Sequence, residues 1–580
     1  MLIKKKRRYS RRDFLKLGAT VVGGTVVACA RGEDIVQLTA TLVPEATPPP
    51  APALLPGEAA DSILLNGNLY TMDAALPTAR ALAVKDGNIL QVGSDESIRS
   101  LAGENTTIID ASGKTVTPGM VDAHNHLQVY GSLHERFVPL LPPDVHTLDA
   151  VIAGIKQAVD QVNPGVWVQA VFWDTEPLPT KRHLDPVSPD NPVWLIQQGG
   201  HYGIANSMAL DIAGITPETQ NPVGGIIERD ASGELTGMFY NHKAMDLLRM
   251  HAPIPTEGEI ISYIKYAGDL FAAAGVTSFQ DVNVRFNALE PYIKAASQGL
   301  LLPRAQIFYT LEWPSDLERA LNEMPTANNN FMKFSGFKFL IDGQFPTWYT
   351  HEPHPGISWD MPTWDIDLFK DAVKQLHDTG LQIAIHCGGD AAVDLTLEAF
   401  EEAMDANPRP DPRHRIEHAV LTKPHATQKM VDLGVSVSCQ PQFLRFTAYI
   451  GENLGEERGA RLKVTREWLD AGVNVALGSD AGSTPWYTPN VTLLGAVTRL
   501  GADDKPFHPE QSMTIQEALY AHTMGSAYAG HEENIKGSLT PGKMADLVVW
   551  SDDFYTVDPM DIVRVKADMT MINGQVVHGE

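Results

Sequence analysis

Eight short apolar segments recur along this chain, each about the length of a buried β-strand, and they constrain its fold more than any other feature. They are Val116–Val121, Val276–Asp281, Arg304–Tyr309, Gly336–Ile341, Gln382–His386, Arg413–His418, Val435–Ser438 and Val473–Ser479. Helical patterns separate many of them, which indicates parallel strands joined by crossovers. Eight such strands are the number that a (β/α)8 TIM barrel requires. We therefore predict an α/β fold built on a TIM barrel.

Two further parts of the chain do not fit a plain barrel. The stretch of about 128–274 is too long for one crossover and contains strand candidates of its own, Trp167–Val171 and Val193–Gln197, so we predict an inserted subdomain. Short apolar runs with Asn-Gly and Asp-Gly turns occupy residues 63–92, and similar runs return near the C-terminus. We predict that residues 58–115 and 535–580 pair into a small β-sandwich formed by both chain ends, which leaves 116–534 for the barrel.

The basic and apolar N-terminus is typical of a signal peptide. The run SRRDFLK at residues 10–16 closely resembles the twin-arginine export motif, and an apolar stretch follows it. That stretch ends in VVAC at 26–29, which resembles a lipobox, so we predict a signal peptide over 1–28 and lipidation of Cys29. The proline-rich residues 29–57 then form an extended tether to the outer face of the membrane. The alternative is ordinary cleavage and a free secreted protein.

The composition excludes some classes of partner. The formal net charge is −26 at pH 7 and the body of the chain has no basic patch with interleaved aromatic residues, which argues against a nucleic-acid partner. The three cysteines are Cys29, Cys387 and Cys439, so no disulfide framework is expected. The expected partners are a small-molecule substrate and, through Cys29, a membrane. The oligomeric state stays open, with a homodimer as one alternative.

Two histidines follow the first apolar segment, in His124-Asn125-His126. Residues two apart on a strand point to the same face, so the two imidazoles are expected side by side. Neutral imidazole is a common ligand of zinc. Taken alone, the pair has an ordinary alternative, which is two exposed or hydrogen-bonded histidines in a loop.

Four more polar residues lie at the ends of later segments or within them. His386, His418 and Asp480 lie at the ends of predicted strands, and Lys338 lies within a strongly apolar segment. A lone histidine at a strand end usually makes a local hydrogen bond, and a lone lysine usually extends to water. Because the active sites of TIM barrels lie at the C-terminal ends of the strands, these residues together with the histidine pair predict one site.

From about residue 61 to its end, the chain resembles the amidohydrolase superfamily, and within it the group called amidohydrolase family 3. The motifs that carry the resemblance are GMVDAHNH at 119–126, Lys338 with Asp342-Gly343, His386 with Gly389-Asp390, RIEH at 415–418, LGSD at 477–480 and GSLTPGKMADL at 537–547. Within the insertion, Pro192-Val193, Gly200-His201 and Asn206-Ser207 also fit.

The resemblance implies a metal-dependent hydrolase of a carbon–nitrogen bond other than a peptide bond, in an amide, formamide or cyclic amide. His124 and His126 are then ligands of one zinc-class ion, and His386 and His418 bind a second ion or complete the first site. Asp480 ligates metal and acts as the general base that carries a proton to the leaving nitrogen. Lys338 matches the lysine that is carboxylated in two-metal members. One or two Zn²⁺ ions are expected, with another divalent metal as the alternative.

Two other functions stay open on the sequence alone. The same site could cleave an ester or remove an amino group, or a surface lipoprotein could keep the fold without catalysis and bind a ligand or partner. A scaffold without catalysis has no physical need for the full set of ligand candidates, which argues against the last alternative. Contacts to the substrate are expected from His201, Trp348, Tyr349 and Trp486. An internal hydrogen bond is an equally good explanation for His201.

Overall fold

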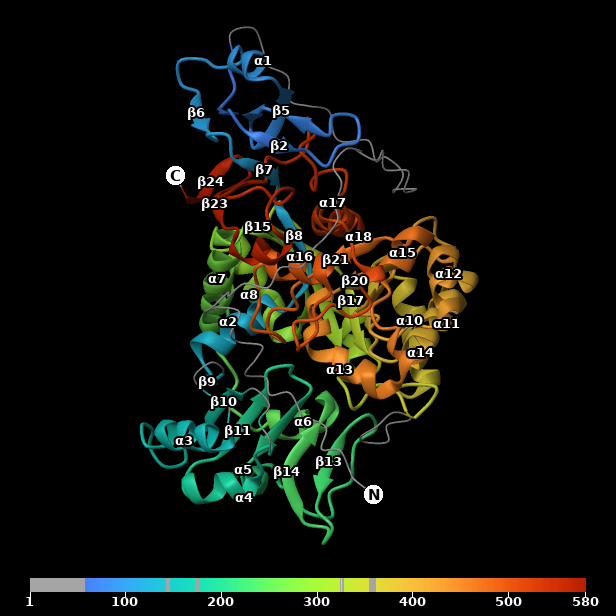
Figure 1. The fold of residues 1–580 in the computed structure, drawn as a ribbon. Coiled ribbons are helices and arrows are strands. Elements are labelled where there is room, and N and C mark those ends of the chain that lie inside the picture. The colour runs from blue at the N-terminus through green and yellow to red at the C-terminus, as the bar shows by residue number, and fades with distance from the viewer. Residues whose placement is uncertain are drawn as a thin grey trace.

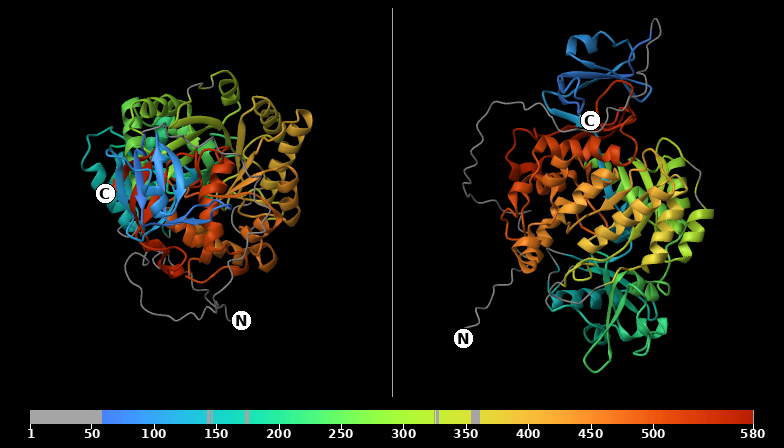
Figure 2. Two further views of the ribbon diagram at one scale, coloured as in Figure 1. Left: turned by 90° about the horizontal axis from the view of Figure 1, so that it is seen from above. Right: turned by 90° about the vertical axis from the view of Figure 1, so that its right-hand side faces the viewer.

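The computed structural model describes residues 58–579, except 142–144, 146, 173–174, 176, 324, 326–327 and 354–360. The predicted signal peptide, the tether and Cys29 lie outside the described residues and stay predictions. The described chain has three parts, with a small β-rich part and the insertion at opposite ends of a central barrel (Figures 1 and 2). Among the described helices, none is both long and apolar enough to cross a membrane.

The central part is an eight-stranded parallel sheet with helices around it, which confirms the predicted (β/α)8 TIM barrel. Its strands, in chain order, are β8 (Met120–Asn125), β15 (Val276–Val284), β16 (Arg304–Leu311), β17 (Met332–Leu340), β18 (Gln382–His386), β19 (Arg415–Glu417), β20 (Ser436–Cys439) and β21 (Val475–Leu477). The helices between them include α7 (Glu257–Ala273), α8 (Phe286–Ser297), α9 (Ser315–Asn322), α10 (Ile366–His377), α11 (Asp390–Ala406), α12 (Pro424–Asp432) and α15 (Thr465–Ala471). Apolar side chains of these strands and helices form one large core.

Backbone hydrogen bonds close the barrel between its last and first strands. The Asp480 N–H donates to the His124 carbonyl at 2.7 Å, and the His126 N–H donates to the Ala481 carbonyl at 2.8 Å. The two strand ends come so close that a Cβ at Gly478 would lie 2.6 Å from the His124 nitrogen. Closure therefore fixes Asp480 beside His124, and it requires glycine at 478.

The first predicted strand is two strands, so the prediction of one strand over Val116–Val121 is wrong. Residues Thr115–Pro118 form β7, which pairs with strands of the small β-rich part, and the barrel strand β8 begins at Met120. Pro118 has no N–H to continue a ladder. Gly119 then brings the backbone against Thr277, where a Cβ would lie 2.0 Å from Oγ1. The chain thus passes from one sheet to another within a single residue.

Strands from both ends of the chain make up the small β-rich part. One sheet has the order β24-β23-β22-β7-β2-β3, with β24 (Gln575–Gly579), β23 (Ala567–Ile572), β22 (Leu547–Trp550), β2 (Asn68–Tyr70) and β3 (Thr78–Ala79). The other has the order β5-β4-β1-β6, with β5 (Asn88–Gly93), β4 (Ala81–Lys85), β1 (Ser62–Leu65) and β6 (Thr107–Asp110). A shared apolar core includes residues of both sheets, such as Leu82 and Leu547. The predicted pairing of the two chain ends is therefore present.

The insertion has a six-stranded mixed sheet of its own. Its order is β13-β14-β12-β11-β10-β9, with β13 (Ile226–Arg229), β14 (Leu235–Tyr240), β12 (Tyr202–Ala205), β11 (Val193–Gln197), β10 (Val168–Phe172) and β9 (Val138–Leu140). Two separate apolar clusters include side chains of this sheet. The helices α3 (Leu148–Val159), α4 (Lys181–Leu184), α5 (Ser207–Ala213) and α6 (Asn241–Arg249) belong to it. Between β11 and β12, residues 198–201 reach the barrel.

Candidate metal site and substrate cavity

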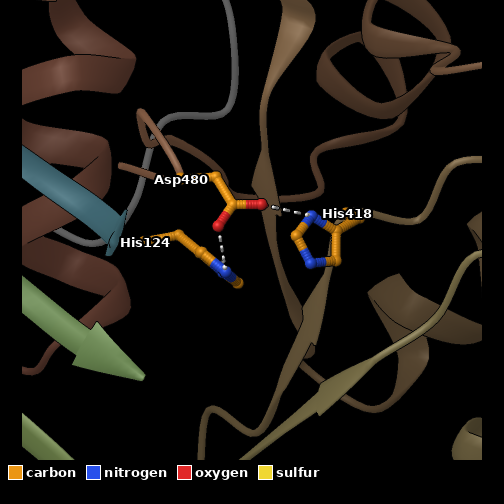
Figure 3. Close-up of side chains that lie close together, drawn as sticks. All are labelled: His124, His418 and Asp480. Carbon is orange, nitrogen blue, oxygen red and sulfur yellow. Dashed lines mark ion pairs between the residues drawn. The ribbon is translucent and has the colours of Figure 1, made fainter. Parts of the chain in front are cut away.

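Histidine and aspartate side chains from separate strands converge at the C-terminal end of the barrel. His124 lies near the end of β8, His386 ends β18, and His418 directly follows β19. Asp480 lies three residues beyond β21. All four are buried. In Figure 3 the Asp480 carboxylate lies between the His124 and His418 imidazoles, and one ligand atom from each of these three lies within 4.8 Å of the others. These three residues could hold a metal ion.

The Asp480 carboxylate is the centre of this group. Its Oδ1 lies 2.9 Å from Nε2 of His126 and 3.5 Å from Nε2 of His124, and its Oδ2 lies 4.0 Å from Nδ1 of His418. Oδ1 is buried and makes no hydrogen bond of good geometry in spite of these distances. A carboxylate oxygen and imidazole nitrogens that are close without bonding to one another suit ligands that share an ion. The residues therefore fit a divalent metal.

His124 is held in place by a buried ion pair. Its Nδ1 lies 2.5 Å from Oε2 of Glu417, and Arg415 donates to both oxygens of Glu417, from Nε at 2.7 Å and from Nη2 at 2.9 Å. Nδ1 must therefore carry the proton, which leaves the Nε2 lone pair for a metal. A carboxylate behind a histidine in this way fixes the ring and strengthens it as a ligand. Arg415 and Glu417 belong to the RIEH motif but had no predicted role, although a charged pair within an apolar strand candidate was a usable signal.

His418 and His386 also have one ring nitrogen engaged. Nδ1 of His418 lies 2.7 Å from Oε1 of Gln440, and Nε2 of His386 lies 3.3 Å from the Gly343 carbonyl. The other nitrogen of each ring stays available as a ligand. The ring centroid of His418 is 4.5 Å from that of His124 and also 4.5 Å from that of His386. The structure thus joins the predicted histidines of three strands in one cluster.

Burial sets the charge of this cluster. Loss of hydration lowers the pKa of His124 to about 4 and holds the pKa of His386 and of His418 well below the ordinary value. The three imidazoles are therefore neutral at neutral pH, which is the form that binds metal. Burial alone would raise the pKa of Asp480, but His124 and His126 hold it below its ordinary range. The carboxylate is ionised and ready to act as a ligand or a base.

Lys338 lies one layer deeper in the barrel. Lys338 pairs with Ala384, whereas Leu340 pairs with His386, so the Lys338 backbone is two residues, or about 6.6 Å, nearer the N-terminal end of the strands. The long lysine side chain can cross such a layer. Burial lowers the pKa of Lys338 to about 8, while the carboxylates of Glu417 and Asp480 act in the opposite direction. A neutral amine is therefore accessible close to physiological pH.

A cavity of about 80 Å³ adjoins the cluster. It is lined by His386, His418 and Asp480, by the loop residues Gln197, Gly199 and His201 of the insertion, and by Gly343, Gln344, Trp348, Gly388, Val420, Phe443, Thr447, Ser483 and Thr484. Of the four predicted substrate contacts, His201 and Trp348 line this cavity. Tyr349 and Trp486 are not among the described lining residues, and Tyr349 packs against the barrel core instead.

Phe443 is a further lining residue of the cavity. Its ring stacks on the His418 imidazole, with centroids 5.8 Å apart and planes 16° apart. It gives one side of the cavity an aromatic wall.

Comparison with known proteins gives consistent matches over most of the chain. A family model described as "Amidohydrolase family" matches residues 107–578. Two relatives are each 30% identical to this chain. The match to "Protein LONG AFTER FAR-RED 3" of Arabidopsis thaliana covers 87% of this chain and 90% of that protein. The match to "N-substituted formamide deformylase" of Arthrobacter pascens covers 85% of this chain and 94% of that protein. A crystal structure described as an uncharacterized metal-dependent hydrolase from Pyrococcus horikoshii has a TM-score of 0.70 at 24% identity, covering 86% of this chain and 99% of that one.

Proposed function

Because this chain belongs to the amidohydrolase family and is a metal-dependent amidohydrolase, we propose that it hydrolyses the carbon–nitrogen bond of small, uncharged N-substituted amides, formamides above all. The observation that carries this proposal is the convergence of imidazoles from the ends of β8 and β19 on the Asp480 carboxylate, with His386 of β18 beside His418, at one wall of a cavity. In this proposal the ligands of the metal are His124, His126, His386, His418 and Asp480.

The residues present suit zinc. Neutral imidazole nitrogens and one carboxylate are the ligand types that Zn²⁺ prefers, and the Glu417 partner of His124 leaves Nε2 of that ring on the side of Asp480. A divalent ion bound here would supply Lewis acidity that polarises a carbonyl and makes water nucleophilic near neutral pH.

Asp480 is the proposed general base. Its ionised carboxylate lines the cavity, where it would take a proton from the attacking water and give it to the leaving nitrogen as the C–N bond breaks. The oxygen of the water stays on the carbonyl carbon, and the products are a carboxylic acid and an amine. The Phe443 wall would hold the substituent on nitrogen.

The number of ions depends on Lys338 in this proposal. A neutral lysine can take up CO2 as a carbamate, and a carbamate has oxygens that can bridge two cations. The low pKa that burial gives Lys338 favours this reaction. Lys338→Ala should then lower the metal content from two ions to one and reduce the turnover, whereas unchanged content and activity would remove Lys338 from the site.

The substrate class rests on the cavity and on one relative. Among the described lining residues there is no lysine or arginine that could neutralise a substrate carboxylate, and Trp348 and Phe443 offer aromatic surface. The relative from Arthrobacter pascens is called an N-substituted formamide deformylase. N-benzylformamide, a small uncharged amide with an aromatic substituent on nitrogen, is the probe that combines these properties.

The test is turnover of N-benzylformamide by the purified, zinc-loaded protein, with formate and benzylamine measured separately. We expect both products in equal amounts, loss of activity after chelation with return on adding Zn²⁺, and loss in Asp480→Asn but not in the surface control Asp149→Asn. Active protein without stoichiometric metal would overturn the metal assignment. Ammonia release from other substrates would favour deamination, cleavage of esters alone an esterase, and bound metal without any turnover a binding protein.

For the cellular location we propose twin-arginine export and anchoring through a lipid on Cys29. The support is the SRRDFLK run and the cysteine that follows a short apolar stretch. Replacing Arg11 and Arg12 by lysine should block export, and Cys29→Ser should move the protein from the membrane fraction to the soluble fraction. A Cys29→Ser protein that stays in the membrane fraction would argue against the lipid anchor.

A further inference from the structure

A second, smaller cavity lies beside the main one, and His201 separates them. The second cavity has a volume of about 20 Å³, room for a group the size of one water molecule. Its described lining residues are His201, Asn241, His242, Lys243, Leu311, Glu312, Leu340, Asp342, Thr363 and Trp364. His201 is the one described residue that lines both cavities.

The His201 imidazole is not fixed by its own hydrogen bonds in the way that the metal-site histidines are. Its backbone is held, since the Asn241 N–H donates to the His201 carbonyl at 2.7 Å and a turn closes between Gln197 and Gly200. Its Nδ1, however, is buried without a hydrogen-bond partner. Its ring lies between two others, with centroids 5.2 Å from His386 and 5.4 Å from His242. The side chain acts as a wall between the two cavities.

The second cavity has a mostly apolar lining, but it includes buried hydrogen-bonding groups without a partner. Nδ2 of Asn241 is buried without a hydrogen-bond partner, although its Oδ1 accepts from Thr347 at 2.9 Å. Nδ1 of His242 also makes no hydrogen bond, and it lies 3.5 Å from Oε1 of Glu312. The Lys243 ammonium is close by, 4.4 Å from the ring of Trp313 and 4.8 Å from that of Trp364. A buried polar atom without a partner is costly, so these atoms favour an occupant that forms hydrogen bonds.

We propose that His201 sets the size of the acyl group that the enzyme accepts, by closing off a second cavity whose unpartnered groups would hold a small hydroxyl-bearing acyl group once the ring is removed. This inference rests on the proposed function, because it takes the substituent on nitrogen to lie against Phe443 and the acyl group to lie toward His201, both of which line the main cavity. The acyl carbon then faces the His201 ring, which leaves space for hydrogen and excludes longer chains. Removing the ring joins the two cavities.

The test compares two amides of nearly equal size, N-benzylglycolamide and N-benzylpropionamide, in the wild-type and His201→Ala enzymes. The wild type should strongly prefer N-benzylformamide over both. In His201→Ala, kcat/KM for the glycolamide should rise about tenfold more than for the propionamide, the range of one or two neutral hydrogen bonds. Calorimetry with glycolate and propionate should give the same order of affinity in the variant, without turnover.

A second variant distinguishes the opening of the second cavity from a general loss of order around the substrate. His242 lines the second cavity but not the first, and phenylalanine keeps a ring there without its nitrogens. In His201→Ala/His242→Phe the preference for glycolamide should disappear. His201→Asn, which also shortens the side chain, replaces His201→Ala if that variant does not fold. A wild-type enzyme that is inactive on every amide would overturn the proposed function. If the wild type is active but the ratio of kcat/KM for the glycolamide to that for the propionamide is unchanged in His201→Ala, this inference alone is overturned.

Discussion

Replacing Glu417 by glutamine tests whether the buried pair behind His124 prepares the metal site. Glu417 accepts one hydrogen bond from Nδ1 of His124 and two from Arg415, and all three side chains are buried. Glutamine has a single acceptor oxygen, so at least one of these donors would face an N–H instead. An unsatisfied buried donor costs about 1–3 kcal/mol. Because Arg415 also loses its counter-charge, we expect the free energy of unfolding of the metal-free protein to fall by about 3–5 kcal/mol.

The same substitution should weaken metal binding. Without the carboxylate, His124 is a poorer ligand and is less well oriented, for which a 10–100-fold loss of zinc affinity is the usual order. Competition with a chromophoric chelator measures the affinity, and denaturation in guanidinium measures the stability. Glu467→Gln is the matched control, because Glu467 also accepts two hydrogen bonds from an arginine, Arg461, without contacting a histidine. Zinc affinity that is unchanged in Glu417→Gln would refute this reasoning.

Three other predictions concern stability. Burial holds the pKa of His414 well below 6.5, so on acidification the unfolded chain takes up a proton that the folded chain does not. The free energy of unfolding should therefore fall by about 2 kcal/mol from this residue as the pH drops from 7 to 5. Equilibrium denaturation of His414→Gln should show a shallower dependence on pH. Gly478→Ala brings a methyl group against the His124 backbone, so both the melting temperature and the zinc content should drop, and normal values would show that the strands can separate. Trp550→Phe removes the 2.9 Å hydrogen bond from the indole to Thr117 and should cost about 1 kcal/mol in denaturation experiments, with a larger loss pointing to altered packing.

The strands of the barrel could be predicted because each is a buried apolar run, and their chemistry could be predicted because functional residues follow them. His386 and His418 are recognisable on these grounds alone. The boundary at Gly119 was missed because the segment is apolar on both sides of it. Pro118-Gly119 carried the information, since a proline next to a glycine interrupts a ladder more often than it continues one.

The surroundings of the site could not be predicted in the same way. Gln440 supports His418 only because two neighbouring strands run in register. Asn241 and His242 belong to the insertion, and they approach the barrel through contacts between residues far apart in sequence. Spacing within one segment contains no information on such contacts. The ligands were therefore accessible to sequence reasoning, but the shape of the substrate cavity was not.

The pairing of β7 with β22 has a consequence for how the protein is made. Thr117 of β7 and Trp550 of β22, whose side chains form a hydrogen bond, are 433 positions apart. A ribosome must therefore complete almost the whole polypeptide before the sheet that leads into the first barrel strand can form. Non-local pairing of this kind makes folding slow and leaves unpaired strand edges exposed during synthesis. A chaperone that shields the nascent chain until the last strands are in place would act at the step where this topology is most vulnerable.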